Sequence, residues 1–395
     1  MTFKAAIILM LAPALLEAAP QREADTYTRY ELLAPATHKF RITYEVTATT
    51  PGATAYYNPI RPGSIASDER VFDRATGKPL HFEEVGGHIA LAAGVEGAKS
   101  EDRFIKVTLA RPVAPGGGGR ILIDKTYEDA RSYHLVGDAI EFDRPLGIKR
   151  NAVVLPPGYE LVALNYPSQV LQQADGRIAV AFWNDAPGQA PLVLRARAAK
   201  IGAGISSLAA SLDERAHQSR NIIYDLKQPE THSFALTHDY TETRPGTATY
   251  VNVVRPGSTV SNPGASDLDT GETLSAETVR GAAVKAVEPA MDVGPDSVAV
   301  VFRFPPVQPG ETRRLRIAET YTDPARYLLT GNELVWHRSL GRADNVVILP
   351  AGWLLTNSSV PATLTMTGDD RVRLSFINPR TDEIDVIITA LRRAK

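Results

Sequence analysis

The sequence predicts an all-β protein built from two tandem copies of a large antiparallel β-sandwich domain, joined by a short helical linker. Apolar and polar residues alternate over many short runs, and Gly, Pro, Asn or Asp interrupt these runs within about ten residues. The same motifs also recur at one fixed distance along the chain. With 395 residues, the chain is longer than a single domain usually is.

The N-terminal segment has the order of features of a secretory signal. Lys4 is followed by an apolar run over 5–16 and by Glu-Ala-Ala-Pro at 17–20. This run is too short to cross a bilayer, and the alternative is a first buried helix. We expect residues 1–18 to be a signal peptide and the mature protein to be soluble, in the periplasm or outside the cell. The absence of cysteine fits an oxidising compartment.

The repeat holds one register over most of the chain. Pro35-Ala-Thr-His38-Lys-Phe40 recurs 194 residues later as Pro229-Glu-Thr-His232-Ser-Phe234. Further pairs at this distance include Tyr133 with Tyr327, Leu155-Pro156 with Leu349-Pro350, and Phe182-x-Asn184 with Phe376-x-Asn378. We therefore predict domains over 24–199 and 222–395 that arose by duplication, since chance does not maintain such a register.

Within each copy, alternation predicts the strands. Every second residue is apolar or aromatic in these runs: Phe40, Ile42, Tyr44 and Val46; Phe234, Leu236, His238 and Tyr240; Ile121 and Ile123; Ile178, Val180 and Phe182; Val372, Leu374 and Phe376. A copy of about 170 residues exceeds an immunoglobulin sandwich of about 100, so it is either one enlarged sandwich or two fused ones divided at 115–119. We favour one sandwich, because the glycine run at 115–119 has no equivalent in the second copy.

The segment 200–221 between the copies predicts a short amphipathic helix. Ile205, Leu208, Leu212 and Ala216 follow helical spacing, and Asp213 lies on another face. We expect this linker helix to pack where the two domains meet.

Paired histidines are candidates for a site, but a structural role is favoured. His38 and His232 each precede a core-facing Phe by two residues, so they share its side of the strand. We predict hydrogen-bonded histidines at strand starts, because no second His or carboxylate lies beside them at ligand spacing.

A paired Arg-Pro-Gly-Ser motif is a candidate anion-binding turn. It places Arg61 and Ser64 in the first copy and Arg255 and Ser258 in the second, each after a tyrosine-containing strand. Arginine suits two-pronged capture of a carboxylate or phosphate. The alternative is a Pro-Gly turn whose arginine pairs with a neighbouring Asp such as Asp68.

Tyrosine and aspartate pairs are further binding candidates. Tyr127 and Asp129 in the first copy match Tyr321 and Asp323 in the second. These side chains would suit a sugar or peptide groove, whereas the alternative is a tyrosine corner that locks a loop.

Two further patterns call for a choice. Asp267-Leu-Asp269-Thr-Gly271-Glu272 resembles a calcium-binding loop, but Asp73-Arg-Ala-Thr-Gly77-Lys78 in the first copy lacks these ligands. We therefore predict an Asp-capped hairpin turn in both copies and no metal site. Trp183, replaced by Ile377 in the second copy, is either an exposed stacking platform or a core residue.

These observations favour an exported, non-catalytic module that binds or scaffolds a peptide, glycan or envelope protein, through end loops or the cleft between the copies. The alternative is a hydrolase with a carboxylate, His or Tyr site in one copy or in that cleft, where copy-specific residues such as His238, Asp239 or His337 would converge. A net charge of −2 with scattered Lys and Arg argues against nucleic acid. We expect no cofactor, and a monomer with domains related by a pseudo-twofold axis.

Overall fold

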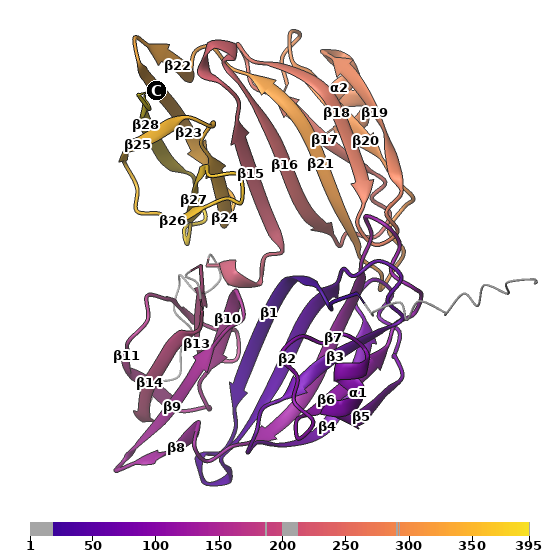
Figure 1. Ribbon diagram of the computed structural model, residues 1–395, viewed down its shortest axis with the longest axis vertical. Coiled ribbons are helices and arrows are strands. Elements are labelled where there is room, and N and C mark those ends of the chain that lie inside the picture. Colours follow the sequence, from indigo (N-terminus) through magenta and orange to yellow (C-terminus); the bar gives the residue numbers. More distant parts are fainter. Residues whose placement is uncertain (1–18, 186–187, 200–211, 290, 292, 395) are drawn as a thin grey trace, which may run out of the picture.

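The computed structural model describes residues 19–185, 188–199, 212–289, 291 and 293–394. These residues form almost exclusively β strands, so the prediction of all-β, sandwich-like domains is confirmed. The strands fall into a first half between Glu23 and Ala198 and a second half between Arg220 and Arg392, which lie one above the other (Figure 1). The predicted signal peptide, 1–18, and residues 200–211 of the predicted linker lie outside the described residues.

The first half has a central sheet and two smaller sheets. The central sheet runs in the order β12 (Gln169–Gln172), β13 (Ile178–Trp183), β10 (Arg150–Val154), β1 (Glu23–Leu32), β2 (Lys39–Ala48), β7 (Gly119–Glu128) and β4 (Ile65–Asp73). One small sheet consists of β3 (Ala55–Ile60), β6 (Arg103–Thr108) and β5 (Phe82–Gly86). The other consists of β11 (Tyr159–Leu164), β14 (Ala190–Ala198), β9 (Ala139–Leu146) and β8 (Tyr133–Val136).

The second half has a longer main sheet and one small sheet. The main sheet runs in the order β17 (Thr249–Val254), β20 (Val298–Arg303), β19 (Thr273–Arg280), β18 (Thr259–Asp267), β21 (Arg313–Thr322), β16 (Ser233–Glu242), β15 (Arg220–Leu226), β24 (Asp344–Ile348), β27 (Val372–Ile377) and β26 (Thr363–Met366). The small sheet consists of β22 (Tyr327–Thr330), β23 (Glu333–Leu340), β28 (Ile384–Arg392) and β25 (Trp353–Ser358).

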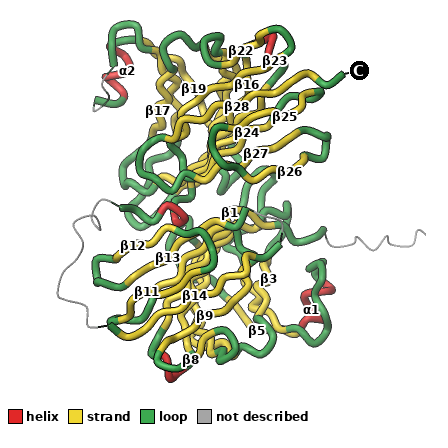
Figure 2. The backbone as a smooth tube through the Cα atoms, turned by 90° about the vertical axis from the view of Figure 1, so that its left-hand side faces the viewer, coloured by secondary structure: helices red, strands yellow, loops and turns green. Residues whose placement is uncertain are grey.

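Strands β1 to β14 and β15 to β28 pair in the same order. The difference is that β18 pairs with β19 and merges two sheets, whereas Phe72 and Pro79 form only an isolated bridge at the matching place. Two short helices, α1 (Gly87–Ala92) and α2 (Ala282–Val287), follow β5 and β19 and lie on opposite sides of the molecule (Figure 2). The origin of the two halves by duplication stays a prediction. The same holds for the predicted domain bounds.

The main sheets are antiparallel except for one parallel pair of strands in each half. β1 pairs with β10 in parallel, with Tyr27 opposite Arg150, and β15 pairs with β24 in the same way. Parallel neighbours need a long connection instead of a hairpin, and more than a hundred residues separate β1 from β10.

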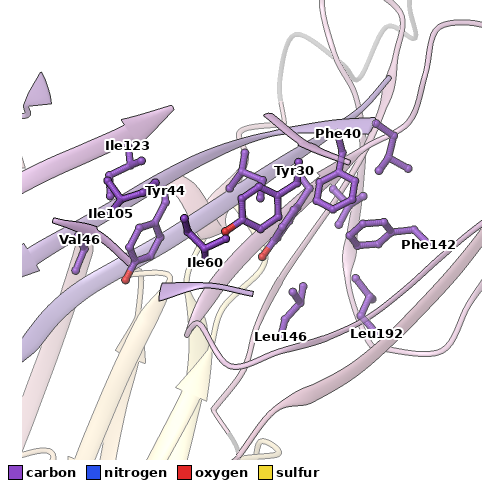
Figure 3. Close-up of a cluster of buried hydrophobic side chains, with 14 of the residues drawn as sticks. Tyr30, Phe40, Tyr44, Val46, Ile60, Ile105, Ile123, Phe142, Leu146 and Leu192 are labelled. Atoms are coloured by element: carbon purple, nitrogen blue, oxygen red, sulfur yellow. The ribbon is translucent and has the colours of Figure 1, made fainter. Parts of the chain in front are cut away.

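One core joins the three sheets of the first half. The alternating residues Phe40, Ile42, Tyr44 and Val46 of β2 are all buried in it. Figure 3 shows labelled side chains of the central sheet beside Ile105 of one small sheet and Phe142 of the other. Strand β7, which follows the glycine run at 115–119, pairs with β2 and β4, which precede it. The first half is therefore one enlarged sandwich.

The described part of the predicted linker, 212–221, contains no α-helix. It forms one 3-10 turn, η2 (Arg215–His217), after which β15 begins at Arg220. Most of the helical spacing, from Ile205 onward, falls on residues outside the described part, and 220–226 pairs on both edges, with β16 and β24. Similar 3-10 turns, η1 (Pro35–Thr37) and η3 (Pro229–Thr231), precede β2 and β16.

Candidate functional site

A cleft of about 1080 Å³ lies at the junction of the two halves. The first half contributes residues of β2, β4 and β7, and the second half contributes the start of β15, the end of β16 and Tyr250 of β17. Alternation along β2 explains one wall, because Phe40, Ile42 and Tyr44 are buried in the core while Arg41 and Thr43 line the cleft.

Arginines outnumber carboxylates on the walls of this cleft. The lining residues that carry charge are Arg41, Arg70, Arg74, Arg120, Arg220 and Arg244, with Glu45, Asp73, Asp124 and Glu242. Asp124 is shared between two guanidinium groups, since Arg41 contacts it with two hydrogen bonds of 2.6 and 2.8 Å and Arg70 also binds it. The side chains of Arg41 and Arg70 are 46% and 61% exposed, so both remain accessible to a ligand.

Arg220 carries a charge that no carboxylate of the described chain neutralises through a salt bridge. Its guanidinium lies 5.8 Å from the ring centroid of Tyr240, within cation–π distance. Burial, together with the neighbouring charge of Arg342, lowers the pKa of Arg220. Arg220 is exposed in the cleft lining, so its N–H donors are accessible to an anion.

A buried ionic cluster holds the two halves together beside the cleft. Ser219 Oγ lies 2.7 and 2.8 Å from the two carboxylate oxygens of Asp25, and these residues occupy equivalent positions of the repeat. Although burial opposes it, the charges of Arg150, Arg314 and Arg74 lower the pKa of Asp25 to about 2. The carboxylate is therefore ionised and links strands of both halves.

A second contact fixes the relative position of the halves. Arg120 of the first half binds both carboxylate oxygens of Asp269 in the second, at 2.5 and 2.9 Å. Gly271 has φ +77°, and a Cβ there would lie 2.4 Å from the carbonyl oxygen of Pro115. The turn over 267–271 therefore needs glycine to approach the backbone of the first half.

The predicted hairpin turns are present, and their carboxylates are used within the protein. Asp73 accepts hydrogen bonds from the amide of Ala75 and the hydroxyl of Thr76, each at 2.9 Å. Asp267 accepts from the amide of Asp269 at 2.8 Å. Within the described residues, no group of three or more His, Asp or Glu side chains is arranged to hold a metal ion.

In the first half, two of the predicted binding residues form a buried network. Ser64 Oγ donates to Asp129 at 3.1 Å, Ser132 Oγ donates at 2.9 Å, and Arg144 lies at 3.2 Å. This network ties the Arg-Pro-Gly-Ser turn to the end of β7. The other two residues, Arg61 and Tyr127, line a separate cavity inside the half.

In the second half, the corresponding residues have fewer partners. Asp323 lies 3.2 Å from Arg338, and the hydroxyl of Tyr321 accepts a hydrogen bond of 3.2 Å from Asn252. The hydroxyl of Ser258 is buried without a hydrogen-bond partner in the described part of the chain. Arg255 is half-buried, and nearby Arg338 adds to burial in lowering its pKa.

Trp183 is a packing residue at the junction, so the interpretation as an exposed platform is wrong. Its exposed fraction is 8%, and it packs with Tyr27, Ala216 and Ala343. Ala216 comes from the linker turn and Ala343 from the second half, so tertiary docking buries the ring. This contact cannot be predicted from the sequence near Trp183, because its partners are distant along the chain.

The paired histidines have a structural role in the turns. His38 and His232 end the 3-10 turns with left-handed φ angles of 53° and 51°. Their Nδ1 atoms lie 3.0 and 2.7 Å from the carbonyl oxygens of Tyr133 and Tyr327. They therefore hold the turn against the neighbouring strand instead of facing the core along β2 or β16.

The copy-specific residues that motivated a hydrolase do not converge. His238 is buried beside Tyr250, with Nδ1 3.2 Å from its hydroxyl, whereas Asp239 on the opposite face of β16 binds Arg316. His337 lies on β23 in another sheet and contacts Asp385 at 2.8 Å. No shared constellation links the three.

None of the nine predicted binding residues lines the cleft between the halves. The predicted binding residues are mostly ones kept in both halves, whereas several charged residues of the cleft wall are not. The first half has Arg41, Arg70 and Asp124 where the second half has Ala235, Gly264 and Ala318 at the equivalent positions of the repeat. A residue-by-residue comparison of charge between the copies would have revealed this wall.

Among the described helices, none combines the length and the apolar character that a membrane crossing requires. No protein-family model and no curated protein matches the chain.

Among solved structures, the chain resembles an M1 zinc metallopeptidase from Deinococcus radiodurans at 11% identity and a TM-score of 0.29, over 44% of this chain and 41% of that one. It also resembles an aminopeptidase N family protein from Idiomarina loihiensis at 13% identity and a TM-score of 0.28, over 46% of this chain and 31% of that one. The chain thus spans less than half the length of either protein.

Proposed function

We propose that this chain is an exported, non-catalytic binding protein that holds a carboxylate-bearing peptide in the cleft between its halves. The observation that carries the proposal is the presence of accessible arginines on both walls of the cleft, Arg41 and Arg70 from one half and Arg220 from the other, in a protein whose net charge is −2. Positive charge exposed in a concave site attracts anionic ligands and raises their association rate.

The arrangement of these arginines supports an anionic ligand. Arg41 and Arg70 share one carboxylate and are half-exposed, so their remaining N–H donors are available to a ligand. Arg220 projects from the other half without a salt bridge in the described chain. A guanidinium from each half would thus grip a peptide that carries more than one carboxylate.

Binding of labelled hexaglutamate and of neutral hexaglutamine, measured by fluorescence anisotropy, tests the proposal. We expect only hexaglutamate to bind, and Arg220→Gln or Arg70→Gln to weaken it at least tenfold, which is about 1.4 kcal/mol. Arg303→Gln is the matched control, since Arg303 is exposed, pairs with Glu277 at 3.2 Å and lies away from the cleft. Equal binding of both peptides, or equal loss in the control, would contradict the proposal.

A third ligand distinguishes a peptide from an acidic glycan. Oligogalacturonate of similar charge offers carboxylates without a peptide backbone. We expect it to compete only weakly with hexaglutamate. The cleft lining has three aromatic rings, Phe72, Tyr240 and Tyr250, on which few sugar units could stack. Tighter binding of the glycan would replace the peptide as the proposed ligand.

Export is the second part of the proposal and rests on the N-terminal pattern of a basic residue, an apolar run and small residues. We expect the full chain, expressed in a bacterium, to be recovered outside the cytoplasm with its N-terminus near residue 19. Recovery in the cytoplasm with residues 1–18 retained would contradict export. Such a result would leave the peptide-binding proposal untouched.

A further inference from the structure

We propose that the cavity inside the first half is a second binding site, which takes a small molecule with one carboxylate and an apolar body. This cavity has a volume of about 670 Å³, within the usual range for small-molecule sites. It lies between the central strands β1, β2 and β7 and the small sheet that contains β3 and β6. The exposed residues Glu96 and Gly97 also line it, so it reaches the surface there.

A buried ammonium group marks the inner end of the cavity. Lys125 is 4% exposed, and its Nζ donates to Asn58 Oδ1 at 2.6 Å and to the hydroxyl of Tyr127 at 3.1 Å. An ammonium has three donors, and no carboxylate of the described chain forms a salt bridge with this one. Burial, with repulsion from Arg144, lowers the pKa of Lys125 to about 7. A bound anion beside this amine would stabilise its charged form and raise its pKa again.

The described charged groups near Lys125 do not supply it with a counter-ion. Arg61 also lines the cavity and has no salt bridge in the described chain, whereas Arg144 is occupied by Asp129 at 3.2 Å. Among the carboxylates that line the cavity, Glu23 is bound by the hydroxyl of Tyr56 at 2.5 Å. A ligand carboxylate would complete the coordination of Lys125 and Arg61.

A buried hydroxyl points independently to a ligand. Thr28 lines the cavity at 3% exposure, and its Oγ1 has no hydrogen-bond partner among the described residues. An unpaired buried hydroxyl is destabilising, so a ligand oxygen that accepts its hydrogen bond stabilises the complex.

The remaining wall suits an apolar body. Tyr30 and Tyr44 extend from the central sheet, and Leu146 lies on the opposing strand (Figure 3). Ile42 and Phe104 add further apolar surface. Burial of apolar area is favourable, so this wall favours a ligand with a hydrocarbon or aromatic portion over a purely polar anion.

The second half provides a matched control for this site. Glu319 occupies the position that corresponds to Lys125, while Asn252 and Tyr321 correspond to Asn58 and Tyr127. Asn252 Nδ2 donates to Glu319, so the same group of side chains is kept with the opposite charge. A carboxylate ligand should therefore distinguish Lys125 from Glu319.

Isothermal titration of the full chain with 3-phenylpropanoate and with its uncharged amide tests the inference. We expect the carboxylate to bind at least tenfold more tightly than the amide. Lys125→Met should weaken carboxylate binding at least tenfold, whereas Glu319→Gln should leave it within twofold of wild type. Equal affinities for the two ligands, no measurable binding at millimolar ligand, or equal effects of the two substitutions would overturn the inference.

Two measurements keep this result interpretable. If Lys125→Met does not fold, as judged by circular dichroism, Arg61→Gln replaces it and should weaken the carboxylate about threefold to tenfold. Excess hexaglutamate should not displace 3-phenylpropanoate, because the two sites are separate. Displacement would assign both ligands to the cleft between the halves and overturn the second site, while absence of hexaglutamate binding would affect only the proposed function.

Discussion

The two halves place opposite charges at the same buried position. Lys125 on β7 and Glu319 on β21 each contact an asparagine and lie two residues before a buried tyrosine of the same strand. Burial lowers the pKa of Lys125 and raises the pKa of Glu319, in both cases to about 7. The shared backbone thus requires hydrogen-bonding partners at this place, but it does not require a particular sign of charge.

A second comparison concerns the paired aspartates near the ends of these strands. Asp129 accepts hydrogen bonds from Ser64, Ser132 and Arg144. Asp323 is paired with Arg338, and Arg326 replaces Ser132 at the matching position. The buried ion pair is therefore kept in both halves, while the hydroxyl donors around it are complete only in the first.

Loss of either aspartate charge should have the largest effect on stability. Asp129→Asn and Asp323→Asn each leave a buried arginine without its counter-ion, which typically costs about 3–5 kcal/mol. We expect Asp129→Asn to cost about 1 kcal/mol more, because hydrogen bonds from two serines also weaken. Urea unfolding followed by tryptophan fluorescence and circular dichroism measures both variants. Equal costs would show that the serine donors contribute nothing.

The buried lysine and glutamate should give opposite pH dependences of stability. Between pH 7 and 10.5, unfolded chains keep Lys125 protonated more than folded chains do, so its penalty to the free energy of unfolding falls as pH rises. Between pH 4.5 and 7, folded chains keep Glu319 protonated more than unfolded chains do, so its penalty grows as pH rises. Each unit of pKa shift corresponds to about 1.4 kcal/mol, so the effects are on the order of 5 kcal/mol for Lys125 and about 3 kcal/mol for Glu319.

Unfolding of wild type, Lys125→Met and Glu319→Gln at several pH values checks these opposite slopes. The stability of Lys125→Met relative to wild type should fall from pH 7 to pH 10. For Glu319→Gln it should rise from pH 4.5 to pH 7. The change with pH is the useful quantity, since each substitution also removes hydrogen bonds at every pH. Parallel profiles for all three proteins would show that neither group titrates as described.

The smallest effect is expected at the paired serines of the Arg-Pro-Gly-Ser turns. Ser64→Ala removes a buried hydrogen bond of 3.1 Å to a charged carboxylate and should cost about 1–2 kcal/mol. Ser258→Ala removes a hydroxyl that has no partner in the described chain and should change stability by less than about 0.5 kcal/mol. The same urea titration compares them. A larger cost for Ser258→Ala would mean that this hydroxyl is paired in solution.

The local sequence predicts the strands but not all of the pairings between them. Alternation at Phe40, Ile42 and Tyr44 reflects one buried face of β2, and turn residues mark its ends. The parallel pairing of Tyr27 with Arg150 leaves no such signal, because backbone hydrogen bonds between distant strands do not depend on a particular side chain. The same applies to 220–226, which pairs with β16 on one edge and with β24 on the other.

The candidate site was harder to predict from the sequence than the fold was. Ser64 and Asp129, two of the candidates from the sequence, proved to lie in a buried network inside the first half. Arg41 and Arg220 are far apart in sequence and meet across the cleft only when the halves dock. Trp183 is buried for the same reason, because Ala216 and Ala343 cover it.

Sequence alone determined the β-rich class, the run of short strands and the register between the two halves, because these follow from side-chain period and turn chemistry within a few residues. Tertiary structure decided the parallel strand pairs, the cleft between the halves and the burial of Lys125 and Glu319. Those features depend on which distant groups are desolvated together, and desolvation is a property of the packed chain and not of any segment.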